Sequence, residues 1–178
     1  GSRFVLTAKH VIAGHSAGLI EVTTTNSDHL SVDSVVQRGG SDDGDDGDHD
    51  WAVLETEDDF DVSPFFLSRR SSSLVDFKAF IRGYPGTTAD SSNPCQDQGL
   101  SLEQFKAGGA VESIGVFDEL LALVSSAQGM SGAPYYYCWT GDCDDGSAQT
   151  AIHKGWTGFH SYGPLVSPIR DTVLGAVS

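Results

Sequence analysis

One serine stands between two glycines in the stretch Gln128-Gly129-Met130-Ser131-Gly132-Ala133-Pro134. An apolar run, Leu120 to Val124, precedes this stretch and three tyrosines, Tyr135 to Tyr137, follow it, so we expect a tight turn between two strands. Because glycine adopts positive φ and has no Cβ, the amides of Gly129 and Ser131 can point at one spot beside the serine hydroxyl. The stretch therefore predicts either a nucleophile turn with an oxyanion hole at Gly129 and Ser131 or an ordinary hairpin loop.

Length and composition limit the classes of protein that the chain can form. Its 178 residues, 39% of them hydrophobic, suffice for one domain or for two small β-barrels that share an interface. The net charge of −15 argues against nucleic acid and an anionic membrane as partners, because both would repel the chain. The sequence contains no apolar run long enough for a membrane span and no opening signal-peptide pattern, so we expect neither in these residues.

The three cysteines cannot all pair with one another. Cys138 and Cys143 flank a short loop that a disulfide could close, while Cys95 stands apart. A disulfide would favour an oxidising compartment, so we expect a secreted or extracellular protein.

A candidate general base follows the first expected strand, which runs from Ser2 to Thr7. The imidazole of His10 titrates near neutrality and can accept a proton from a serine hydroxyl, although a surface histidine at a strand end is the alternative. An apolar run that ends in Thr-Ala-x-His-Val resembles the histidine segment of chymotrypsin-like serine proteases. That resemblance implies that His10 lies on a short helical turn after a barrel strand.

A candidate orienting acid, Asp50, stands directly before the apolar strand that begins at Trp51. The segment resembles the Asp-x-Ala-x-Leu pattern that carries the third triad member in the same protease class. A carboxylate at the start of a buried strand is held rigidly enough to fix the tautomer of a histidine. Asp50 is alternatively only the last acid of the preceding run, and Asp48 is a second carboxylate without the strand in register.

The acidic run from Arg38 to Asp48 alternates aspartate with glycine. It lacks the terminal glutamate of a calcium-binding loop, so we expect a solvated surface loop and no metal. No sequence feature calls for a cofactor.

The second half of the chain shows a further series of short strands. Residues 63–73 mix proline, serine and arginine and are typical of a connection, which divides the chain into lobes at 1–68 and 69–178. Glycines separate the expected strands, and Ser167 as cap with Pro168 in the first turn predicts a short terminal helix. The expected strands after the connection are Asp76 to Ile81, Leu100 to Phe105, Ala110 to Ile114, Leu120 to Val124 and Gln149 to Gly155.

Two segments bear on substrate preference. Gly83-Tyr84-Pro85-Gly86 and Ile152-His153-Lys154-Gly155 resemble the glutamyl endopeptidase branch and the viral chymotrypsin-like proteases, so a virus-encoded protein is an alternative origin. The resemblance implies that His153 and Ser126 bind the side chain before the cut, and that cleavage follows glutamate, with aspartate or glutamine as lesser options. A half-buried histidine satisfied by its neighbours is the bland alternative.

The order His10, Asp50, Ser131 matches the order of base, acid and nucleophile in chymotrypsin-like enzymes. The resemblance implies an all-β fold of two antiparallel barrels, and a serine endopeptidase acting on a protein or peptide substrate; the alternative is an inactive binding or assembly module. Two features depart from the pattern. Met130 replaces the aspartate that pancreatic enzymes use in activation, and only nine residues precede His10. We therefore expect a first barrel that is incomplete or that another segment or chain completes.

Overall fold

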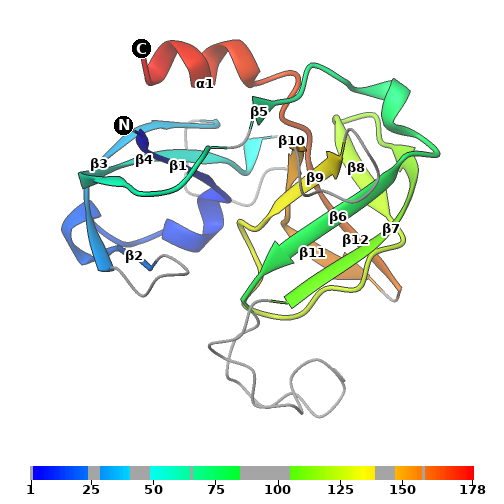
Figure 1. Cartoon of the computed structure of the whole chain (residues 1–178), viewed down its shortest axis with the longest axis horizontal. Helices are drawn as coiled ribbons and strands as arrows, with labels where there is room; N and C mark the ends of the chain where they lie inside the picture. The colour runs from blue at the N-terminus through cyan, green and yellow to red at the C-terminus, as the bar shows by residue number, and fades with distance from the viewer. Residues whose placement is uncertain are drawn as a thin grey trace.

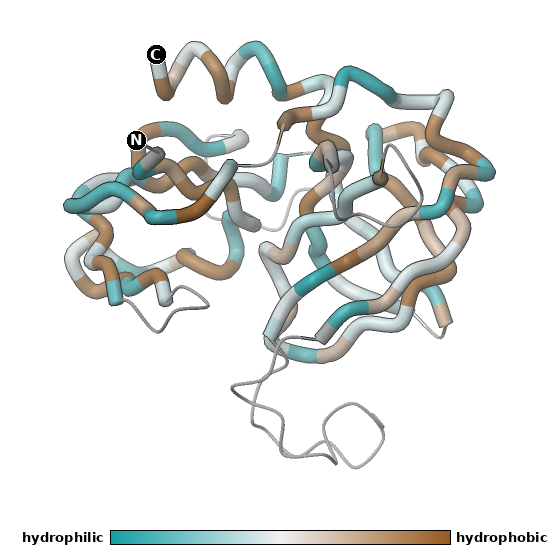
Figure 2. Tube along the Cα trace, viewed as in Figure 1, coloured by the Kyte–Doolittle hydropathy of each residue, from teal (hydrophilic) through white to brown (hydrophobic). Residues whose placement is uncertain are grey.

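The computed structural model of the chain describes residues 2–23, 29–40, 49–64, 66–84, 105–138, 147–157 and 159–178. The described residues form two β-sheets and one α-helix near the C-terminus (Figure 1). Polar and apolar segments follow one another along both sheets (Figure 2), as expected for strands with one face toward a core. None of the helices in these residues has the length and apolar character needed to cross a membrane.

The first sheet carries the N-terminal half of the chain in the order β1-β4-β3-β2, with all neighbours antiparallel. Strands β2 and β3 are consecutive in the chain and pair antiparallel, and residues 24–28 between them lie outside the described residues. The strands are β1 (Ser2–Thr7), β2 (Glu21–Thr23), β3 (His29–Arg38) and β4 (Ala52–Phe60), with the 3-10 turns η1 (Lys9–Ile12) and η2 (Ala17–Leu19) between β1 and β2.

Strand β4 is buried on both faces because its residues alternate between two cores. Val53, with Trp51 just before the strand, packs into a core that also holds Val173 of the terminal helix. Ala52 and Leu54 face a second core with Ile12 and Val32. The segment around Asp50 is therefore fixed from both sides before any polar contact is considered.

The second sheet has the order β11-β12-β8-β7-β6-β9-β10-β5 and curls around its own apolar core. Its neighbours pair antiparallel except for β5, which pairs in parallel with β10 and lies before the expected lobe boundary at residue 68. The elements are β5 (Phe66–Leu67), η4 (Ser72–Leu74), β6 (Lys78–Gly83), β7 (Phe105–Ile114), β8 (Glu119–Ala122), β9 (Pro134–Cys138), β10 (Ser147–Ile152), β11 (Gly155–Thr157) and β12 (His160–Pro164).

The glycines of β7 were wrongly predicted to separate two strands. Gly108 and Gly109 lie inside one continuous strand. A Cβ atom on Gly109 would overlap the carbonyl of Leu123, and one on Gly108 would lie 2.7 Å from the ring of Phe80. The two glycines thus permit close packing across the sheet and do not end the strand.

The terminal helix α1 (Arg170–Ala176) begins later than predicted, and Ser167 does not cap it. The residue before the helix is Ile169, which has no side-chain cap, and its amide donates to the Val166 carbonyl at 3.1 Å. Residues 167–169 therefore form a separate turn. The helix still packs on the first lobe, because Val173 is buried in the core beside β4.

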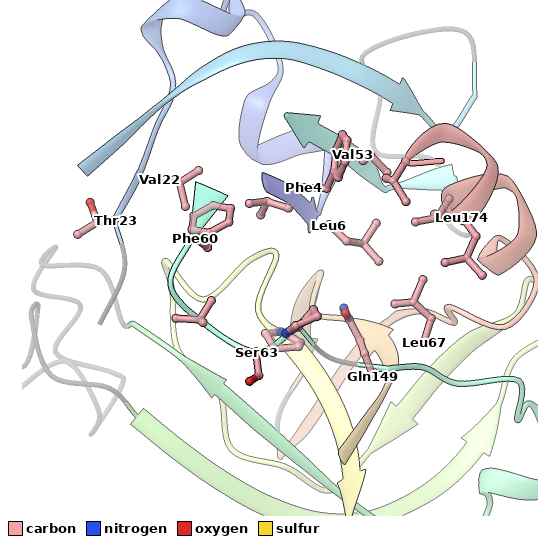
Figure 3. Close-up of a pocket in the computed structure, with 16 residues that line it drawn as sticks. Phe4, Leu6, Val22, Thr23, Val53, Phe60, Ser63, Leu67, Gln149 and Leu174 are labelled. Carbon is pink, nitrogen blue, oxygen red and sulfur yellow. The ribbon is translucent and has the colours of Figure 1, made fainter. Parts of the chain in front are cut away.

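An apolar cavity of about 550 Å³ lies beside the first sheet, with Phe4 and Leu6 of β1, Val22 of β2 and Leu174 of α1 among its lining residues (Figure 3). Both end strands of that sheet, β1 and β2, contribute to it. The segment or chain expected to complete the first barrel stays a prediction.

Several sequence expectations fall wholly or partly outside the described residues. These are residues 41–48, which hold the aspartates of the acidic run, residues 100–104 of an expected strand, residues 85–86 of the Gly-Tyr-Pro-Gly segment, and Cys95 and Cys143. Cys138 takes part in a disulfide.

Candidate active site

A buried carboxylate holds His10 at two points. Asp50 Oδ1 accepts a hydrogen bond from the His10 backbone amide at 2.9 Å, and Asp50 Oδ2 lies 2.6 Å from His10 Nδ1. Asp50 is fully buried, while the imidazole is partly exposed at the end of β1, on η1. The structure thus brings together two of the residues predicted from sequence. Asp50 fixes the imidazole through the backbone amide of His10 as well as through the ring itself.

The charge of Asp50 is stabilised in place. Burial by itself would raise the pKa of this carboxyl, but the hydrogen bonds from the His10 ring and amide, with the nearby charge of Lys154, bring the pKa below its usual value. An ionised Asp50 accepts a hydrogen bond from His10 Nδ1–H. The free lone pair of the neutral imidazole then lies on Nε2. His10 is then in the tautomer that a general base requires.

The turn around Ser131 has the backbone that its two glycines allow. Gly129 and Gly132 have φ of 87° and 88°, which side chains with a Cβ rarely adopt. The Met130 amide donates to the Ala127 carbonyl at 3.2 Å, and the Ala133 amide donates to the Met130 carbonyl at 3.0 Å. Met130 itself is buried in the second core.

The amides of this turn alternate between bonded and unbonded. Those of Met130, Gly132 and Ala133 donate to backbone carbonyls, whereas within the described part of the chain those of Gly129 and Ser131 have no acceptor. Two unbonded amides on either side of one residue are the donors that an oxyanion hole needs.

Gly132 brings the serine turn to the first lobe. A Cβ atom on Gly132 would overlap Thr7 Oγ1 and would lie 3.3 Å from the Ala8 amide nitrogen, so only glycine permits this contact. Ala8 stands two residues before His10. The Ser131 hydroxyl itself donates to the Lys154 carbonyl at 3.3 Å, and the described structure has no hydrogen bond between Ser131 and His10.

His153 lies directly behind the same turn and is fully buried. Its backbone carbonyl accepts from the Gly132 amide and its amide donates to the Ala133 carbonyl, both at 2.8 Å. Neither ring nitrogen has a hydrogen-bond partner in the described structure, and the ring stacks on Tyr135 with centroids 5.7 Å apart. Burial, with a smaller effect of the nearby His10, lowers the pKa of His153 to about 4, so the ring is neutral at pH 7.

Ser126, the other residue predicted to bind substrate, also has a buried hydroxyl without a partner among the described residues. Both side chains carry unsatisfied polar atoms, and both residues lie on segments that backbone hydrogen bonds join to the nucleophile turn. Such atoms are uncommon in folded proteins and ask for an explanation.

Solved structures of other proteins resemble the whole chain. The chain is similar to a Glu endopeptidase solved in complex with MPD, with a TM-score of 0.70, 15% identity, and coverage of 97% of this chain and 80% of that one. It is also similar to the active form of the Rv3671c protease from M. tuberculosis, with a TM-score of 0.65, 14% identity, and coverage of 99% and 70%. A serine endoprotease from Yersinia pestis gives a TM-score of 0.67 at 18% identity, with coverage of 98% and 53%.

The chain has the chymotrypsin-like serine protease fold. The two sheets and the short terminal helix agree with that fold, and the predicted fold class is confirmed. At identities of 14–18% these neighbours show the fold alone. No protein-family model and no curated protein matches the sequence.

Within this chymotrypsin-like fold, sequence reasoning missed several residues around the site. The Lys154 carbonyl accepts a hydrogen bond from the Ser131 hydroxyl, and the buried hydroxyls of Tyr135 and Ser161 interact with each other. A backbone carbonyl leaves no signal in a sequence. The three tyrosines after the turn predicted a strand, but they did not indicate which of their rings would stack on His153.

A metal centre finds no support in the described ranges, since no three His, Cys, Asp or Glu side chains gather there closely enough to hold an ion. The polar groups of the site are instead one carboxylate, two imidazoles, hydroxyls and backbone amides. Such a set can move protons and stabilise an oxyanion.

Proposed function

We propose that the protein is a serine endopeptidase in which Ser131 is the nucleophile, His10 the general base and Asp50 the orienting acid. The observation that carries the proposal is the two-point contact between buried Asp50 and His10, which sets the imidazole tautomer before substrate arrives. The unbonded amides of Gly129 and Ser131 add to it. The comparisons supply the fold on which this chemistry is common.

The reaction follows from these groups. Ser131 Oγ attacks the scissile carbonyl while its proton passes to His10 Nε2, and Asp50 stabilises the imidazolium that forms. The amides of Gly129 and Ser131 donate to the oxyanion. The C–N bond then breaks as the imidazolium gives its proton to the leaving amine, and water, activated by the same imidazole, hydrolyses the acyl-enzyme.

For the residue before the cut, we propose glutamate, with aspartate or glutamine cleaved more slowly. His153 and Ser126 carry buried polar atoms without partners, and a carboxylate or amide entering beside them would satisfy these atoms. An apolar side chain would leave them unpaired, and this penalty is a strong basis for discrimination.

A second candidate is an inactive binding module, and one observation favours it. The Ser131 hydroxyl donates to the Lys154 carbonyl and not to His10. A serine hydroxyl rotates about the Cα–Cβ and Cβ–Oγ bonds, and catalytic hydrogen bonds are often long or poorly aligned when no substrate is bound. Turnover therefore decides between the two candidates.

A peptide library that varies the residue before the cut tests the proposal. We expect cleavage after acidic residues, and the preference should fall by at least about tenfold in His153→Ala, the scale of one charge-assisted hydrogen bond. His153→Gln, which keeps a donor, should retain more of the preference. His15→Ala, which changes an exposed histidine, is the matched control. Cleavage chiefly after Arg, Lys or large apolar residues would overturn the specificity, and absence of cleavage in the parent would favour the module.

A further inference from the structure

Strand β6 presents basic and aromatic side chains on the face that points away from the second core. Ala79 and Ile81 face the core, so that Lys78, Phe80 and Arg82 occupy the opposite face. Lys106 of β7 stands directly across from Arg82. We name the set of Lys78, Arg82 and Lys106 the cationic face; β6 lies between β7 and β9 in the sheet (Figure 1).

Among the described residues, the cations of this face have no carboxylate partners. In the described residues Arg3, Lys154 and Arg170 pair with acids, whereas Lys78, Arg82 and Lys106 do not. This is unexpected in a chain with 25 acidic residues and 10 Lys and Arg. The nearest acid along β7, Glu112, is exposed and bonded to His160 Nε2 at 2.6 Å.

Aromatic rings hold the cations in place. The ammonium groups of Lys78 and Lys106 lie 5.0 Å and 5.4 Å from the centre of the Phe80 ring. The Arg82 guanidinium lies 5.8 Å from the centre of Tyr136, which stacks on Phe80 with centroids 5.8 Å apart. Cations fixed over rings lose less conformational entropy when they bind an anion.

The register itself carries an electrostatic cost. Like charges directly across two strands destabilise a sheet, and Arg82 and Lys106 are such a pair. Arg82 is partly buried, and its Nε is buried without a partner in the described structure. An anion bound between Arg82 and Lys106 would remove the repulsion between them. Anion binding at this face would therefore explain why the two like charges stand opposite each other.

The cationic face lies close to the candidate active site because β6 pairs with β9. Phe80 and Ile81 pair with Tyr136 and Tyr135. Strand β9 begins at Pro134, three residues after Ser131, so the end of β6 lies beside the start of the strand that follows the nucleophile turn. A polypeptide bound at Ser131 can therefore continue across the end of β6.

We propose that the cationic face binds an acidic stretch of the protein substrate outside the cleft. The proposal rests on the proposed function, cleavage after acidic residues, and extends it. The net charge of −15 slows the approach of such substrates, and three cations that pair with no carboxylate of the described residues supply a local attraction beside the site. Lys78 and Arg82 are four residues apart on β6, so carboxylates four residues apart on an extended peptide have the same spacing as these cations. The net charge opposes a nucleic acid far more strongly than a short acidic peptide.

The first test measures binding without catalysis. In the Ser131→Ala protein, labelled poly-glutamate peptide should bind roughly threefold to tenfold more weakly after Arg82→Gln with Lys106→Gln, and added salt should erase the difference. Arg3→Gln with Arg170→Gln removes the same net charge elsewhere and should leave the affinity unchanged. Equal binding by both double variants would overturn the proposal, as would tighter binding of a DNA oligonucleotide than of poly-glutamate. Self-association that depends on the face would overturn it in favour of a second copy as occupant.

The second test uses catalysis in the protein with Ser131 intact. A peptide with one glutamate and the same peptide with an acidic tail should differ in kcat/KM, and the Arg82→Gln, Lys106→Gln variant should lose the advantage of the tail while cleaving the short peptide as before. An advantage that persists would contradict the role in substrate binding. Face-dependent binding of poly-glutamate without any peptide cleavage would refute the proposed function but leave this face as an acidic-peptide site.

Discussion

Asp50 and His153 are both fully buried polar side chains near one turn, yet their surroundings are opposite. Both oxygens of Asp50 have partners on His10, whereas neither ring nitrogen of His153 has one in the described structure. A satisfied buried group is fixed before substrate binds, while an unsatisfied one reduces stability until a partner arrives. Under the proposed function, the first pair serves proton transfer and the second residue serves recognition of the substrate.

The largest expected effect comes from breaking the satisfied pair. Asp50→Asn keeps the shape of the side chain but allows the amide to donate to His10, which favours the wrong tautomer, so kcat should fall by about a thousandfold to ten-thousandfold. Steady-state kinetics on an acidic peptide substrate would measure this fall. Asp58→Asn, on an exposed part of β4, is the control and should be neutral. Unchanged kcat in Asp50→Asn would show that His10 does not depend on this carboxylate.

A smaller effect should appear in the pH dependence of stability, through His153. Its pKa is about 4 in the folded protein and ordinarily near 6.5 in an unfolded chain. Between these values the unfolded chain binds a proton that the folded protein does not, so the free energy of unfolding decreases as pH falls from about 6.5 to 4, by at most about 3 kcal/mol. The pKa of Asp50 is lowered, so the stability that Asp50 contributes is lost only at lower pH, below the ordinary range of aspartate.

Urea unfolding at neutral and mildly acidic pH would measure the effect of His153. The His153→Gln variant should lose less stability than the parent on acidification, because glutamine does not titrate. His15→Gln, at an exposed histidine, should behave like the parent. An equal loss in the parent and in His153→Gln would mean that His153 is not held neutral by burial.

Local patterns predicted the parts of the fold and site that depend on neighbours in sequence. The strand before His10 and the strand after Asp50 were predicted because an apolar run adjoins each of these polar residues, whereas the resemblance to chymotrypsin-like proteases implied the short turn that carries His10. The triad roles and the substrate preference remain predictions.

Other features depend on contacts that the sequence does not encode locally. Gly108 and Gly109 were interpreted as a break between strands. The sequence does not distinguish a glycine that allows close packing of a neighbouring segment from a glycine that ends a strand. The start of α1 was misplaced because Pro168 fits a preceding turn as well as a first helical turn. The pairing of Arg82 with Lys106 follows from the register of β6 and β7, whose connecting residues give no indication of it.

Labelling with a fluorophosphonate probe, followed by peptide mapping, tests the central claim most directly. The probe reacts only with a serine hydroxyl that a neighbouring base activates and whose adduct an oxyanion hole receives. We expect the label on Ser131, loss of both labelling and peptide cleavage in Ser131→Ala, and strong reduction in His10→Ala, while Ser72→Ala on η4 labels like the parent. An unlabelled Ser131 in the parent, or cleavage that persists in Ser131→Ala, would contradict the assignment of Ser131 as the nucleophile.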